Sequence, residues 1–332
     1  MSAPFIKTLA VTIGDVNGIG PEVALKALAQ TPRRRDVRIV LVGPETAWRY
    51  WQNYLRINLP LPRIVDINEW PEGAPLVVLD NTSETAEIQI GALSKAAGKI
   101  AGEALTRAMA LGRAGKIHAI VTAPLNKHAL HLAGFHYPGQ TELLAEGLGA
   151  SEFAMMLVAE NFRVALVTTH LPLRHVAAAI STDLILRRLR VLQKDLTKRF
   201  QIAQPRLAVT GLNPHAGEGG LLGDEEKNII APALAQARAE GLYAEGPFSA
   251  DALFGQYKKN NFDAYLAMYH DQGLIPLKMF GFGRAVNYTA GLPVIRTSPD
   301  HGTAFDIAGK NLADPASMVE AFRLAAALLA AN

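Results

Sequence analysis

Short apolar runs alternate with longer segments of helical periodicity along the whole chain. Apolar runs of about four to eight residues are typical of buried strands, and apolar positions three or four residues apart are typical of helices. Their alternation predicts an α/β protein with a mostly parallel sheet that is covered on both faces. The predicted strands include Leu9–Ile13, Val37–Val42, Leu76–Leu79, Ala119–Thr122, Val286–Thr289 and Val294–Ser298, and the predicted helices are Pro21–Leu28, Glu45–Tyr54, Ala92–Gly112, Thr182–Phe200, Glu225–Glu240 and Pro315–Ala331.

Three further apolar runs each lead to a histidine, at His170, His215 and His270. Ligands of open α/β sheets bind beyond the carboxyl ends of the strands, so we expect three imidazoles at one rim. Taken singly, each histidine is also typical of a hydrogen-bonded loop residue. The repeated context favours a site for zinc or a similar divalent ion, because three neutral imidazoles commonly bind such ions and leave positions open for substrate.

Three other segments have less specific patterns. Gly14–Glu22 lacks the G-x-G-x-x-G spacing of a Rossmann fingerprint, and it fits a tight strand-to-helix turn as well as a ligand contact. The glycine-containing residues 216–220 after His215 predict a flexible loop. Lys278 lies in an apolar segment that predicts a turn, where a lysine side chain extends its ammonium group to solvent.

Composition excludes several classes of protein. The 332 residues carry a formal net charge of only +3, which does not favour nucleic acid as a partner. The absence of cysteine excludes disulfides and thiolate ligands and fits a reducing compartment. No apolar run approaches the length of a membrane span, and residues 1–7 lack the features of a signal peptide. We therefore expect a cytoplasmic protein with no membrane partner.

Several motifs resemble known dehydrogenases. His301–Asn311 is similar to the adenosine-binding loop of isopropylmalate and isocitrate dehydrogenases, which bind nicotinamide cofactors without a Rossmann fold. Together with the other motifs, it makes essentially the whole chain similar to the 4-hydroxythreonine-4-phosphate dehydrogenase family of pyridoxine phosphate synthesis. The other motifs are Gly14–Glu22, Thr122–Lys127, Thr168–His170, Leu212–Glu218 and Tyr269–Gly273.

The resemblance implies a two-domain α/β/α sandwich of the isocitrate/isopropylmalate dehydrogenase type, with the active site in the cleft between the domains. Residues 1–125 with 297–332 would form the cofactor-side domain, and residues 126–296 the domain for metal, substrate and dimerisation. The resemblance also implies a homodimer with active sites at the interface, in which one subunit supplies His170 and His215 and its partner supplies His270.

The resemblance assigns the metal to His170, His215 and His270. Histidine ligands favour zinc, with magnesium or cobalt as the alternatives. Five residues are expected to contact the substrate: Gln140, Thr141, Lys278, Asn287 and Arg296. Gln140 departs from the family, which usually has a histidine there. A glutamine can donate a hydrogen bond but cannot be protonated, which leaves the choice of substrate open.

The same resemblance assigns a nicotinamide cofactor to the loop after the last strand. The residues expected to bind it are His301, Gly302, Thr303, Ala304 and Asp306. A carboxylate at Asp306 would accept hydrogen bonds from the adenosine ribose and repel a 2′-phosphate, so NAD is favoured and NADP is the alternative.

The implied reaction is the oxidation of 4-phosphooxy-L-threonine by NAD, followed by loss of carbon dioxide to give 3-amino-2-oxopropyl phosphate. Asp271, Asp251 and Lys278 are the candidates for proton transfer. The two aspartates are as typical of turn formation as of catalysis. Which of the three is the general base stays open.

Two alternatives remain at this point. Related family members act on D-threonate or D-erythronate 4-phosphate, or on a dihydrodiol dicarboxylate, and they would share the metal and the cofactor loop. A zinc hydrolase with three histidines belongs to a different class, and it would have no use for the loop at His301–Gly309.

Overall fold

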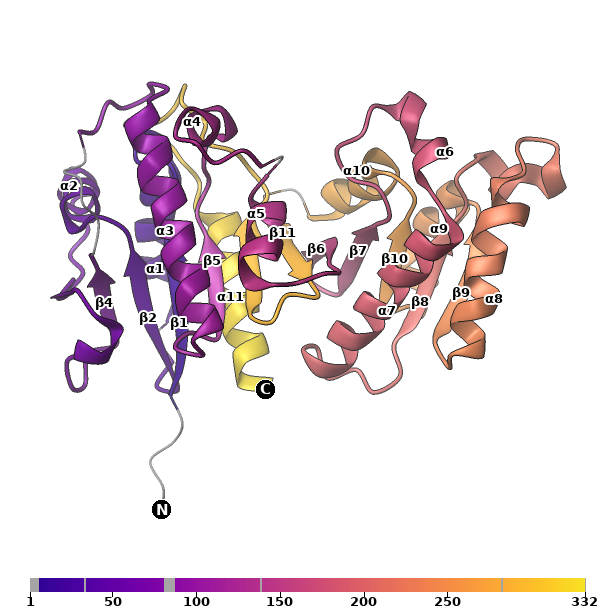
Figure 1. Cartoon of the computed structure of the whole chain (residues 1–332), viewed down its shortest axis with the longest axis horizontal. Helices are drawn as coiled ribbons and strands as arrows, with labels where there is room; N and C mark the ends of the chain where they lie inside the picture. Colours follow the sequence, from indigo (N-terminus) through magenta and orange to yellow (C-terminus); the bar gives the residue numbers. More distant parts are fainter. Residues whose placement is uncertain (1–5, 33, 81–86, 138, 282, 332) are drawn as a thin grey trace, which may run out of the picture. The chain divides into compact units, whose positions relative to one another are not determined.

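The computed structural model describes residues 6–32, 34–80, 87–137, 139–281 and 283–331. Residues 1–5, which begin the segment used to argue against a signal peptide, lie outside this description. The chain divides into two compact units, Met1–Ser151 with Leu292–Ala330 and Glu152–Gly291 with Ala331–Asn332. Figure 1 shows the first unit from indigo to magenta with the yellow C-terminal helix, and the second in rose and orange.

The first unit is built on parallel strands in the order β3-β4-β2-β1-β5-β12. Helix α3 packs on β1, β2 and β5, and α4 and α5 pack on α3. The strands are β1 (Lys7–Thr12), β2 (Val37–Val42), β3 (Arg63–Ile64), β4 (Leu76–Leu79), β5 (Ala119–Thr122) and β12 (Ile295–Pro299). The helices are α1 (Gly20–Gln30), α2 (Glu45–Leu55), η1 (Ile67–Glu69), α3 (Lys95–Arg113), α4 (Lys127–Leu132), α5 (Gln140–Leu148) and α11 (Ala316–Ala331).

The second unit has the strand order β11-β6-β7-β10-β8-β9. β6 is antiparallel to β11 and β7, and the remaining pairs are parallel. The strands are β6 (Ala154–Ala159), β7 (Phe162–Leu166), β8 (Arg206–Thr210), β9 (Tyr243–Phe248), β10 (Ala264–Ala267) and β11 (Val286–Ala290). The helices are η2 (Leu173–His175), α6 (Val176–Ala179), α7 (Thr182–Lys198), η3 (Pro214–Gly220), η4 (Glu226–Ile230), α8 (Ala231–Ala239), α9 (Ala250–Gly255), η5 (Tyr257–Lys259) and α10 (His270–Gly281).

Burial explains why the strands have nearly continuous apolar sequences. Every residue of β4, β5 and β10 is buried, which is typical of parallel strands covered on both faces. Around β10 the second unit packs a cluster that includes Phe162, Tyr265 and Leu274. In the first unit, the indole nitrogen of fully buried Trp51 donates to the Val16 carbonyl at 2.9 Å and holds α2 against the turn after β1.

The predicted α/β class is confirmed, and most predicted elements are present. β6 and β9 were not predicted. The prediction of a turn around Lys278 is wrong, because Lys278 lies within α10, which also contains Pro276. Residues 126–151, which we had expected in the second domain, belong to the first compact unit. They lie there because α4 and α5 pack on α3. The roles assigned to the two domains stay predictions.

Within the part of the chain that the structure describes, no helix is both long and apolar enough to cross a membrane.

Candidate functional site

The three predicted histidines follow three adjacent strands of the second unit. β10 pairs in parallel with β7 on one side and with β8 on the other, so the carboxyl ends of the three strands lie at one edge. His170 follows β7, His215 follows β8, and His270 begins α10 directly after β10. The expectation of neighbouring strand ends is therefore confirmed. The imidazole rings of His170 and His270 have their centroids 5.7 Å apart.

Two polar side chains join these strand ends. The Thr168 hydroxyl donates to the Met268 carbonyl at 2.7 Å, which links the end of β7 to the end of β10. The Gln272 amide oxygen accepts from the Met268 amide at 2.7 Å and from the Thr210 hydroxyl at 2.8 Å, while its nitrogen donates to the Gly211 carbonyl at 2.7 Å. Gln272 thereby fixes β10 against β8. Sequence analysis gave it no role, although it lies in the motif Tyr269–Gly273.

His270 lines one cavity with two predicted catalytic residues, Asp271 and Lys278. Its Nδ1 lies 2.7 Å from an Asp271 carboxylate oxygen, a contact that orients the ring and leaves Nε2 for another partner. Lys278 lies two turns further along the same helix. A cavity of about 530 Å³ is lined by His270, Asp271, Leu274, Ile275, Lys278 and Met279.

His215 lies in an ordered turn of unusual geometry. The five residues from His215 to Gly219 have φ values of 51, 51, 80, 44 and 68°, all in the left-handed region. That region costs a residue other than glycine about 1–2 kcal/mol, and His215, Ala216 and Glu218 have side chains. The structure gives this segment, expected from the sequence to be a flexible loop, a left-handed backbone conformation, and its flexibility stays a prediction.

Asp251, in α9, is the second predicted acid near a histidine. Its carboxylate accepts a hydrogen bond from the Ser249 hydroxyl. That bond, the Ala252 amide and the nearby charge of His215 lower the pKa of Asp251. Asp251 is therefore ionised at neutral pH, and its negative charge is suited to stabilise a cationic partner.

The donor set of this edge fits a divalent ion such as zinc. Imidazole nitrogen is among the ordinary ligands of zinc in proteins. The Asp271 contact of His270 is typical of a metal-binding histidine. Among the residues described here, no group of three or more histidine, aspartate or glutamate side chains is placed to hold a metal within one chain.

In the first unit, Arg296 is the most deeply buried of the predicted substrate residues. Its guanidinium, 2% exposed, donates to the Thr122 hydroxyl at 2.9 Å and to the Gln140 side-chain oxygen at 3.2 Å. Burial lowers the pKa of Arg296 to about 10, and Glu142 opposes that shift. Arg296 therefore stays charged at neutral pH. Thr141 lies beside Gln140 in the first turn of α5.

Asn287 lies on β11 in the second unit, opposite Leu157 of β6. The side chain is half-buried, and its Oδ1 atom is buried without a hydrogen-bond donor among the described residues. A buried carbonyl oxygen left without a donor carries a cost, so this atom is available to a ligand group that donates a hydrogen bond.

The predicted cofactor loop follows β12 and is fixed at both ends. At its start, the Asp300 amide donates to the Ser317 hydroxyl at 3.0 Å, and the Thr303 carbonyl accepts from the Ile19 amide at 3.0 Å. Between the anchors, His301, Gly302 and Asp306 are exposed, while Thr303 and Ala304 are half-buried.

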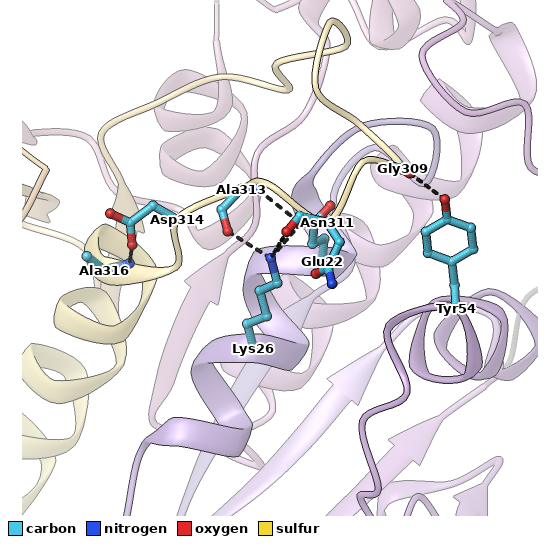
Figure 2. Close-up of polar contacts among 8 residues, drawn as sticks. All are labelled: Glu22, Lys26, Tyr54, Gly309, Asn311, Ala313, Asp314 and Ala316. Carbon is cyan, nitrogen blue, oxygen red and sulfur yellow. Dashed lines mark hydrogen bonds and ion pairs between the residues drawn. The ribbon is translucent and has the colours of Figure 1, made fainter.

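Figure 2 shows the anchors at the other end of this loop. Lys26 donates to the carbonyls of Asn311 and Ala313 at 3.2 and 2.9 Å and to the buried Glu22 carboxylate at 2.7 Å. Glu22 also accepts from the Ala313 amide at 3.1 Å, and the Tyr54 hydroxyl donates to the Gly309 carbonyl. Two residues of the Gly14–Glu22 motif, Ile19 and Glu22, therefore hold the cofactor loop in place. The spacing of the motif did not reveal this role.

Asp15 lies fully buried in the turn after β1. Its Oδ1 accepts from the Asn17 amide at 2.9 Å, and its Oδ2 has no hydrogen-bond partner within the described residues. Burial raises the pKa of Asp15 to about 6, against the opposing effect of the Asn17 and Gly18 amides. Asn17 in turn holds the segment 89–92 through the Gln89 amide and the Ala92 carbonyl.

Comparison with known proteins connects these residues to one family. The family model described as the pyridoxal phosphate biosynthetic protein PdxA matches residues 36–325. A 4-hydroxythreonine-4-phosphate dehydrogenase of Sulfurihydrogenibium sp. (strain YO3AOP1) is 42% identical over 96% of this chain and 97% of its own length. A Bradyrhizobium diazoefficiens protein, provisionally named D-threonate 4-phosphate dehydrogenase, is 43% identical over 97% of this chain and 96% of its own.

Solved structures give the same result. The crystal structure of a 4-hydroxythreonine-4-phosphate dehydrogenase from Klebsiella pneumoniae is similar with a TM-score of 0.88 and 41% identity, over 98% of this chain and 99% of that one.

The raised pKa of Asp15 predicts a particular dependence of stability on pH. The folded state binds the Asp15 proton more tightly than the unfolded state, so this residue destabilises the fold progressively as pH rises from about 4 to about 6. The shift corresponds to about 3 kcal/mol. In Asp15→Asn, which keeps the acceptor for the Asn17 amide, this loss should be absent. Urea unfolding at several pH values should show that the free energy of unfolding of the variant rises relative to that of the wild type as pH increases from about 4 to about 6. A constant difference would contradict the prediction.

Proposed function

The chain belongs to the family of the pyridoxal phosphate biosynthetic protein PdxA, and we propose that it oxidises and decarboxylates 4-phosphooxy-L-threonine with NAD. The products are 3-amino-2-oxopropyl phosphate and carbon dioxide, in the biosynthesis of pyridoxine 5′-phosphate. The proposal rests on the 42% identity, over nearly the full length of both chains, to a relative named for this dehydrogenase. A cytoplasmic location, expected from the sequence, remains a prediction.

His170, His215 and His270 are the proposed metal ligands, with zinc favoured over magnesium or cobalt. A divalent ion bound there would supply Lewis-acid chemistry, which favours both loss of the hydroxyl proton and departure of the carboxylate. Asp271 orients His270 through the 2.7 Å contact at Nδ1. The proton of the substrate hydroxyl passes to one of three residues of this chain: Asp271, Asp251 or Lys278.

The substrate has two anionic ends, and the proposed contacts supply matching cations and donors. Lys278 lines the same cavity as His270, which supports a role for its ammonium group beside the reacting carbon or the phosphate. Arg296 is buried with its guanidinium held by Thr122 and Gln140, an arrangement suited to a carboxylate or phosphate. Asn287 and Thr141 complete the proposed substrate contacts.

NAD is the proposed oxidant, bound along His301, Gly302, Thr303, Ala304 and Asp306, and NADP is the alternative. The loop is anchored at both ends while Asp306 is exposed, which supports a preformed surface for the adenosine. When bound there, the cofactor would accept the hydride from the substrate carbon. The chain's own contribution is to hold the loop in place.

We propose a homodimer with shared active sites. The face of α10 that carries His270 and Lys278 also presents Ile275 and Met279, which are 57% and 82% exposed. Exposed apolar side chains beside functional residues are typical of a surface that meets a partner. Ligands from two chains would also account for the lack of a complete metal-binding group within the described part of one chain.

D-threonate or D-erythronate 4-phosphate is the second candidate for the substrate. One relative with 43% identity has a name of this kind, and Gln140 replaces the family's usual histidine here. The hydrolase considered from the sequence has no support, because the family is one of dehydrogenases. The two remaining candidates share all the chemistry except recognition of the substrate.

A substrate panel tests the proposed function. Purified enzyme reloaded with zinc should form NADH fastest with 4-phosphooxy-L-threonine, more slowly with D-threonate and D-erythronate 4-phosphates, and not at all after exhaustive chelation. His170→Ala, His215→Ala and His270→Ala should each reduce the metal content. A higher kcat/KM for D-threonate 4-phosphate would assign the protein to the second candidate. Full activity of metal-free enzyme would remove the metal from the proposal.

Asp306 is expected to set the preference for NAD. Its carboxylate would bond the ribose hydroxyls and repel a 2′-phosphate, so Asp306→Lys should shift the ratio of kcat/KM for NADP over NAD upward by at least roughly tenfold. Asp314→Lys, a change of the same charge outside the cofactor residues, is the matched control. Wild-type enzyme that uses NADP more efficiently than NAD would contradict the role of Asp306.

Mixed dimers test whether the site is shared. His170→Ala and His270→Ala, each expected to be inactive in isolation, are unfolded and refolded together. If His170 and His270 of one site come from different chains, half of the dimers are mixed and each contains one intact site, so about a quarter of wild-type activity returns. Refolded mixtures that form dimers and bind NAD without recovering turnover would show that all the ligands come from one chain.

A further inference from the structure

The left-handed turn that carries His215 needs stabilising contacts with residues outside the turn. Its residues do not favour the conformation, because His215, Ala216 and Glu218 have side chains at positive φ. The turn ends at Gly219, and a second helical segment begins at Glu226. Contacts between these two segments therefore determine how His215 is presented.

Glu226 supplies these contacts. Its side chain is 6% exposed, and its Oε1 accepts from the amides of Leu212 and Asn213, both at 2.8 Å. Its Oε2 accepts from the Asn213 side-chain nitrogen at 3.0 Å. Hydrogen bonds to an ionised carboxylate are about twice as strong as those between neutral groups. Glu226 thus fixes the backbone immediately before His215.

The same carboxylate lies against the turn on its other side. A Cβ atom at Gly217 would come within 2.6 Å of Glu226 Oε2, and one at Gly211 within 2.9 Å of Oε1. Both glycines are needed for this close approach, one before His215 and one after it. The Glu226 carboxylate therefore lies close to the backbone on both sides of His215, at Gly211 and at Gly217.

The helix that carries Glu226 also departs from regular geometry. η4 is a π-helix from Glu226 to Ile230 and leads directly into α8. Such π turns are rare and frequently lie at functional sites, where they redirect a side chain. The buried position of Glu226, at the first residue of this turn, is consistent with that use.

We propose that Glu226 is the positioning residue of His215: its carboxylate holds the left-handed turn that presents the imidazole to the metal ion. The inference rests on the proposed metal site. Glu226 acts through His215, and its removal should loosen the turn even where no metal is present. Sequence analysis gave Glu226 no role.

Metal affinity is the first test, measured on full-length, metal-depleted protein by competition between zinc and a chromogenic chelator. Glu226→Ala should weaken zinc binding by about 10- to 100-fold, the usual effect of removing a partner that orients a metal ligand. Glu226→Gln, which keeps one oxygen for the Leu212 and Asn213 amides, should have a smaller effect. Asp224→Asn is the control: the Asp224 side chain accepts from the Asn228 side chain, and the substitution should leave zinc affinity unchanged.

A double-mutant cycle separates positioning from general stability. If Glu226 acts through His215, Glu226→Gln should not weaken zinc binding further in a His215→Ala background. Equal losses in both backgrounds, or wild-type affinity in Glu226→Ala, would overturn the proposal. Wild-type protein that binds no zinc would instead count against the proposed metal site.

Hydrogen exchange gives a readout without metal or substrate. The Leu212 and Asn213 amides should be protected in the metal-free wild type and exchange much faster in Glu226→Ala. If Glu226→Ala does not fold, Glu226→Gln is compared with the wild type instead. Its amides should then exchange faster only within residues 211–220. Unchanged exchange in a folded variant would refute the role of Glu226 whatever the outcome for the metal.

Discussion

The parallel pairing of β7, β10 and β8 is the constraint on which the second unit's chemistry depends. Buried parallel strands accept few polar side chains, so the reactive groups come after the strands end. At that point the backbone loses its partners in the ladder, and its donors and acceptors must be satisfied in another way. Thr168 and Gln272 do so, and in the same contacts they fix the three strand ends relative to one another.

In the first unit, the notable feature is the burial of ionisable side chains. Asp15 follows the carboxyl end of β1, Arg296 is the second residue of β12, and burial shifts the pKa of each toward the neutral form. Burying ionisable groups costs free energy, so they persist where their charge has a use. The Arg296 guanidinium donates to two neutral groups, the Thr122 hydroxyl and the Gln140 side-chain oxygen, and the charge of Glu142 opposes the lowering of its pKa.

Sequence patterns were sufficient for the features that depend on local order. The strand-end histidines could be predicted because each follows an apolar run along the chain. Local patterns failed at β9, a half-exposed strand that contains Gly246 and Pro247, and at α10, whose Pro276 predicts a break. They could not reveal Glu226 or Gln272, whose partners lie from 4 to 62 residues away and are chosen by the fold.

Gln140 illustrates how a departure from a family pattern can have a local electrostatic reason. Its side-chain oxygen accepts from the Arg296 guanidinium, so its nitrogen is left as a donor at every pH. A histidine at this position could accept a hydrogen bond from Arg296 only while its ring is neutral. A protonated ring would place a second positive charge beside the guanidinium. Glutamine therefore keeps Arg296 paired under all conditions and removes one protonation equilibrium from the site. A ligand bound at this place would meet a neutral amide donor in place of an ionisable ring.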